Sequence, residues 1–121
     1  MEFHLAGSAV PGAPGLHFSF YATGERLWTG FDGEEGPYVS ARAFGDNLCD
    51  LADIVRLFRR HGLDVPDTWV RTLTAGVAAA CGDGRPPFGW LTDGTPLTSF
   101  AGTAGLPCVL AMLKTYRVTG E

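Results

Sequence analysis

The sequence predicts an α+β protein in which an antiparallel sheet of three to five strands is covered on one face by two or three helices. Residues 16–44 contain short runs in which apolar and polar side chains alternate, the period of a half-buried strand. Two later runs repeat their apolar side chains every three or four residues, the period of a helix. The 121 residues are expected to form a single globular domain. Its expected segments are strands and turns in 1–45, two helices in 46–81, a Gly/Pro-rich ordered loop or hairpin in 82–105, and a C-terminal helix or strand in 106–121.

The expected sheet is built from short N-terminal runs, of which the clearest are residues 16–22, 26–31 and 37–44. Short turns separate these runs, which favours antiparallel neighbours. Tyr38 and Arg42 share one face of the last run, and Tyr21 lies on the polar face of the first. If strand pairing brings the three side chains together, they form an exposed polar and aromatic surface of the kind that interfaces favour.

Two helices are expected over residues 47–61 and 67–81. Asp46 and Asp67 each stand where a side chain can accept hydrogen bonds from the free N–H groups of the first turn. In the second helix, Gly76 lies among alanines, and small side chains let two backbones approach closely. This helix is therefore expected to pack tightly against the first helix or the sheet.

The C-terminal segment, residues 107–118, fits both periods. Val109, Met112, Leu113 and Tyr116 recur at helical spacing, but alternate residues of the same segment, among them Cys108 and Leu110, also fit a strand. A helix over Pro107–Tyr116 is favoured, since proline suits a first helical turn. The strand interpretation stays open at this point.

Residues 82–105 are rich in glycine and proline, yet the segment also carries several large apolar side chains. Long loops without structure are uncommon in compact domains and are usually functional or disordered. Asp93 and Gly94 form a hairpin turn signal, and Pro96 restricts the strand that follows to a sheet edge or a bulge. We predict an ordered, partly buried loop that covers the core or presents a contact surface. Its candidate binding residues are Arg85, Phe88, Trp90 and Asp93.

Composition narrows the class of partner. The net charge is −4 and the isoelectric point is near 5.2, with five acidic and two basic residues in the first 45. Binding to nucleic acid or to an anionic membrane needs a basic stripe, which the sequence lacks. The first residues carry an acid where a signal peptide has positive charge. Three widely spaced cysteines indicate buried thiols in a reducing compartment, so a cytoplasmic protein is expected.

Catalytic and metal-binding motifs are weak. The three histidines and three cysteines stand far apart, whereas metal ligands usually come in closely spaced pairs, so neither a metal nor a cofactor is expected. Among the cysteines, only Cys108, beside Pro107 and near a helix start, has a setting in which a thiol becomes reactive. An enzyme is therefore not favoured.

Two functions remain as hypotheses. The first is a small acidic cytoplasmic protein that acts by protein–protein interaction or self-association, as a regulator, an inhibitor or an immunity-type binding protein. The second is a small-molecule-binding protein or small enzyme with a pocket between the sheet and the 82–105 loop. The small size, the acidic charge and the missing catalytic constellation favour the first hypothesis.

Overall fold

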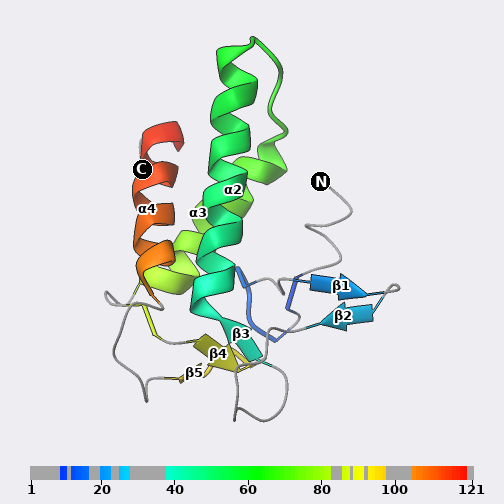
Figure 1. Ribbon diagram of the computed structural model, residues 1–121, viewed down its shortest axis with the longest axis vertical. Helices are drawn as coiled ribbons and strands as arrows, with labels where there is room; N and C mark the ends of the chain where they lie inside the picture. Colours follow the sequence, from blue (N-terminus) through cyan, green and yellow to red (C-terminus); the bar gives the residue numbers. More distant parts are fainter. Residues whose placement is uncertain are drawn as a thin grey trace.

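The computed structural model describes residues 9–10, 12–16, 20–22, 25–27, 38–82, 86–87, 89–91, 93–97 and 105–119. Helices dominate this part of the chain (Figure 1): α2 (Ala41–Arg60), α3 (Asp67–Cys81) and α4 (Leu106–Thr119). The strands are two or three residues long: β1 (Phe20–Ala22), β2 (Glu25–Leu27), β3 (Tyr38–Ser40), β4 (Gly89–Leu91) and β5 (Pro96–Leu97).

The predicted α+β class is wrong, because the protein is mainly helical. In the described part of the chain, β1 pairs only with β2, and β3, β4 and β5 form a separate antiparallel group in that order. The predicted sheet of three to five N-terminal strands therefore does not form. In Figure 1 the short strands lie at one end of the helices, and no helix layer covers a broad sheet.

The largest error concerns the third predicted strand, residues 37–44. Strand geometry holds only at Tyr38–Ser40, and α2 begins at Ala41. Ala41, Phe44 and Leu48 lie on one face of this helix and are almost fully buried. A helix therefore buries these three side chains on one face. In a strand, Ala41 and Phe44 would point to opposite faces. Asp46 consequently lies inside α2 and does not cap it.

The other two helices agree more closely with the sequence. α3 begins and ends at the predicted residues, but its cap position is held by Pro66 without a side-chain hydrogen bond, so Asp67 is a first-turn acid and not the cap. The C-terminal segment is a helix, and the strand alternative for it is wrong. The turn at Asp93 is also confirmed: the Asp93 carboxylate accepts a hydrogen bond from the Thr95 N–H at 2.9 Å, and Gly94 has a φ of +91°.

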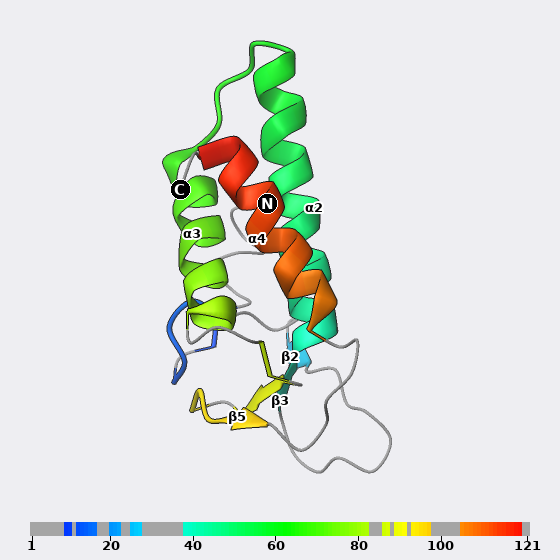
Figure 2. The same ribbon diagram turned by 90° about the vertical axis from the view of Figure 1, so that its left-hand side faces the viewer.

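The core lies between the three helices. Phe44 and Val55 from α2, Leu73 from α3 and Cys108 from α4 are its most completely buried large side chains. Figures 1 and 2 show α2 and α4 running in the same direction. Trp90 from β4 closes one end of the core, with its ring edge against Phe44 at a centroid separation of 5.7 Å.

The contact between α2 and α4 depends on Gly45. A Cβ atom at this position would lie 2.5 Å from the Pro107 carbonyl carbon and 2.7 Å from the Pro107 Cβ. Both distances are far inside van der Waals contact, and one of the atoms belongs to the backbone. Next to this contact, the Cys108 thiol donates a hydrogen bond to the Ala41 carbonyl at 3.2 Å. The two helices can meet here only because residue 45 has no side chain.

We expect Gly45→Ala to lower the free energy of unfolding by roughly 1–3 kcal/mol, because the added methyl group overpacks a rigid helix contact. Gly76→Ala is the matched comparison and should cost less, since its added Cβ would meet the ends of the buried Leu48 and Phe44 side chains and no backbone atom. Urea denaturation followed by circular dichroism measures both changes. Equal unfolding midpoints for the two variants would show that the α2–α4 contact does not depend on Gly45.

Candidate functional site

Helix α4 buries its small side chains and exposes its large ones. Its buried residues are Cys108, Ala111 and Thr115. Leu106 and Leu113 are each 59% exposed, a fraction typical of charged side chains. A single exposed leucine is ordinary in a soluble protein, but a row of them on one helix face is not.

Leu106, Leu110 and Leu113 follow one another at separations of four and three residues. That spacing places them in a single line along the helix surface. We call these three residues the leucine face. Tyr116, which is also exposed, extends the line by one turn. Figure 2, which looks onto α4, shows α2 and α3 on either side of this helix. The large apolar side chains therefore point away from both neighbouring helices.

The close approach of α2 explains why α4 buries its small side chains and exposes its large apolar ones. The backbone of α4 at Pro107 and Cys108 lies against Gly45, so the side of α4 that meets the core has room only for small side chains. The large apolar residues of α4 occupy the remaining surface, where no packing within the described residues requires them. Their presence there favours contact with another molecule over a role in the core.

An acidic edge borders the leucine face. Asp46, Asp50 and Asp53 are exposed on α2 at separations of four and three residues. Asp53 forms an ion pair with Lys114 of α4 at 2.8 Å, and this hydrogen-bonded contact raises the pKa of the Lys114 ammonium. Because Leu110 lies one turn before Lys114, the ion pair places the acidic edge directly beside the leucine face.

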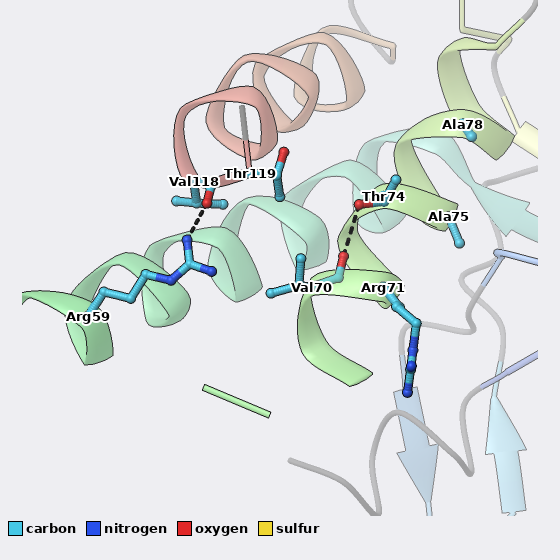
Figure 3. Close-up of a pocket in the computed structure, with 8 residues that line it drawn as sticks. All are labelled: Arg59, Val70, Arg71, Thr74, Ala75, Ala78, Val118 and Thr119. Carbon is cyan, nitrogen blue, oxygen red and sulfur yellow. Dashed lines mark hydrogen bonds between the residues drawn. The ribbon is translucent and has the colours of Figure 1, made fainter. Parts of the chain in front are cut away.

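An open groove of about 600 Å³ lies beside α3 and the C-terminal ends of α2 and α4 (Figure 3). Its lining residues are Arg59, Val70, Arg71, Thr74, Ala75, Ala78, Val118 and Thr119. Arg59 donates to the Val118 carbonyl, and the Thr74 hydroxyl donates to the Val70 carbonyl at 3.0 Å. Arg59 and Arg71 point in different directions in Figure 3. Arg59 and Thr74 thus bond within the chain, and the two arginines of the groove do not converge on one point.

A smaller hollow of about 210 Å³ lies at the other end of α3. Trp90, Asp93 and Gly94 line it, together with Ala79 and residues of the 12–16 turn. The structure thus brings together two residues that the sequence nominated for binding. Trp90 is nevertheless buried, with 4% of its surface exposed, and it packs on Phe44. Asp93 is exposed, and its carboxylate holds the turn.

The other nominated residues are spread over separate elements. Tyr21 lies in β1 and Tyr38 in β3, which belong to different strand groups. Arg42 lies in the first turn of α2 and not in a strand. The sheet face that was expected to carry all three therefore does not exist. Arg85 and Phe88 lie outside the described residues.

The cysteines are packing residues. Burial raises the pKa of the Cys108 thiol to about 12, and it also raises the pKa of Cys49 and of Cys81. Cys108 is fully buried, so the hypothesis that it is the reactive thiol is wrong. In the described part of the chain, no three His, Cys, Asp or Glu side chains lie close enough to hold a metal ion.

Sequence reasoning overlooked the leucine face. The signal was present, because α4 reaches the core with small residues (Cys108, Ala111 and Thr115) and carries further apolar residues elsewhere. The helical pattern in the sequence, Val109, Met112, Leu113 and Tyr116, includes one member of the leucine face, Leu113, whereas Leu110 entered only the strand alternative. An amphipathic helix needs only one apolar stripe to reach its own core. A second stripe on the same helix indicates a second contact.

Comparison of the chain with protein-family models, curated proteins and solved structures finds no match. Among the described helices, none is long and apolar enough to cross a membrane.

We expect the protein to lose stability as the pH rises above about 9. The Cys108 pKa is 9.0 when the thiol is exposed and about 12 in the fold, so between these values the folded state holds the proton more strongly than the unfolded state. At pH 10 this difference lowers the free energy of unfolding by about 1 kcal/mol relative to pH 7. Urea titrations of the protein and of Cys108→Ala at both pH values measure it. An equal pH dependence in the two proteins would contradict the assignment.

We expect Trp90→Ala to destabilise the fold by about 3–5 kcal/mol, because it removes a buried ring and its edge contact with Phe44. Trp90→Phe, which keeps most of the apolar volume, should cost clearly less. Thermal unfolding of both variants measures the difference. A Trp90→Ala variant as stable as the parent would show that this ring serves the neighbouring hollow and not the core.

Proposed function

We propose that this small acidic protein acts in the cytoplasm by binding a polypeptide through the leucine face of α4. The observation that carries the proposal is the exposure of Leu106, Leu110 and Leu113 in one line, on a helix whose inner side is already packed. Three aligned leucines at a helix surface are the usual anchors in helix-mediated recognition.

The energetics support this use of the surface. Full burial of an exposed leucine side chain contributes about 1.5–3 kcal/mol, and because these three are 48–59% exposed, covering each supplies roughly half of that. Translational and side-chain entropy opposes association, and only the surplus appears as affinity. In the free protein the same side chains stay in contact with water, and this cost favours a bound state.

The acidic edge indicates what the partner carries. Asp46, Asp50 and Asp53 lie along one side of the leucine face, so a partner helix with apolar residues on one stripe and basic residues beside it would match both features. Charges of this kind steer encounter and fix register, while the leucines provide most of the affinity.

Binding of a small molecule is the less favoured alternative. The hollow beside Trp90 and Asp93 has a volume of about 210 Å³, below the roughly 300–1,000 Å³ typical of ligand sites. The larger groove lies on the other side of α3 and involves neither of these residues. Neither hollow has polar side chains that converge on one point.

A photo-crosslinking amino acid placed at Leu110 should form a covalent adduct with a polypeptide when the protein is expressed in its native host. Leu91 is the matched control, because it is an exposed leucine on β4, away from α4. Mass spectrometry of the adduct identifies the partner. A second change, Leu113→Lys, should suppress the adduct at Leu110 without unfolding the protein, since Leu113 lies on the surface. No adduct at Leu110, or equal adducts at both positions, would contradict the proposal.

A further inference from the structure

We infer that the polypeptide which binds at the beginning of the leucine face is a second copy of this chain, with the C-terminal half of its α2 lying antiparallel along the N-terminal half of α2 and the start of α4. This inference rests on the proposed function, because it names the partner of the same surface. Three features of α2 support a second copy as the partner: its projection beyond the other helices, its division of charge and its exposed leucine.

The C-terminal end of α2 projects from the molecule. In Figures 1 and 2 it extends past the ends of both α3 and α4. Leu57 in this segment is 51% exposed, and Leu63 just beyond it is 54% exposed. Arg56 and Arg60 flank Leu57 and are also exposed. The segment therefore presents an apolar residue between two cations, which is the chemistry that the acidic edge and the leucine face require.

The outer surface of α2 is divided by charge. After Arg42, which is exposed in the first turn, its N-terminal half carries Asp46 and Asp50, and its C-terminal half carries Arg56 and Arg60. Each pair is separated by four residues, a spacing at which like charges repel and destabilise a helix by a few tenths of a kcal/mol. None of these four side chains forms an ion pair with another residue of the described part of the chain. Opposite charges from a partner would relieve both repulsions.

In an antiparallel pair of α2 helices, one register places the acidic side chains of each N-terminal half opposite the basic side chains of the other copy's C-terminal half. When Asp46 lies opposite Arg60 of the second copy, Asp50 lies opposite its Arg56, and Asp53 falls on the two-fold axis. Asp53 can occupy the axis because its charge is already balanced by Lys114. Two-fold symmetry forms every such contact twice, as in an isologous dimer.

The same register brings the leucines together. Leu57 of the second copy comes level with Cys49, whose thiol donates a hydrogen bond to the Pro107 carbonyl at 3.5 Å. Pro107 directly follows Leu106 and lies three residues before Leu110, so Leu57 reaches the beginning of the leucine face. Burial of these side chains drives the association, and the aspartate–arginine pairs set its direction.

Sedimentation velocity of the full chain over a concentration series tests the inference. We expect a dimer, and we expect Asp46→Arg and Arg60→Asp each to weaken it by roughly 10- to 100-fold, because each reversal places like charges at two symmetric contacts. The double variant Asp46→Arg with Arg60→Asp restores opposite charges in both contacts and should recover most of the dimer. Arg71→Asp, an exposed reversal on α3, is the control and should leave the dimer unchanged.

Two outcomes would overturn the inference: a parent protein that is monomeric throughout the series, or a double variant as weak as the single ones. Circular dichroism of each variant shows whether its helices are intact. The crosslink at Leu110 shows whether only the second copy is wrong or whether the proposed function is wrong as well. An adduct with twice the chain mass supports the second copy, an adduct with a different protein overturns the second copy and keeps the function, and no adduct overturns both.

Discussion

The close contact between α2 and α4 at Gly45 is the constraint on which the rest of the structure depends. Residue 45 has no side chain, so the α4 backbone at Pro107 and Cys108 can lie directly against α2. The Cys108 thiol then reaches the Ala41 carbonyl, and the core receives only small side chains from α4. Larger residues on this side of α4 would separate the helices and open the core around Phe44. The position of α4, and with it the position of the leucine face, follows from one glycine.

This constraint also leads us to propose a functional site on the surface and not in a cavity. The thiols and small residues fill the space between the closely packed helices. Cys108 is therefore buried, its pKa is strongly raised, and its thiol is not available as a nucleophile. The groove along α3 is open and the hollow beside Trp90 is small, and Arg59, Thr74 and Asp93, which line them, bond within the chain. The feature that internal packing does not explain is the row of large apolar side chains on the outer side of α4.

The sequence allowed the helices to be predicted better than the way they combine. Periodicity located α3 correctly, and the Asp93–Gly94 turn was recognised from the local backbone preferences of its residues. The start of α2 was missed because alternation around Tyr38 and the presence of Gly45 both argue against a helix locally. Only burial of Ala41 and Phe44 against the other helices, which is a long-range effect, decides in favour of helix. Likewise, Trp90 was identified as important, but no local signal distinguishes a ring that closes the core from one that binds a ligand.

The division of charge on α2 has two physical explanations, the helix dipole and a contact with another molecule. The positions of the charged residues along α2 distinguish between them. Acids early and bases late in a helix are favoured by the helix dipole, but that effect is confined to the first and last turns. Arg59 and Arg60 lie in the last turn, and Arg59 bonds to the end of α4. Asp50 and Asp53, in contrast, lie in the middle of α2, where the dipole gives no advantage, and they stand beside the leucine face. Asp53 is accounted for by Lys114, whereas Asp50 has no counterpart in the described fold. Neither the dipole nor the described part of the fold accounts for Asp50, and a contact with another molecule is the explanation that we propose for it.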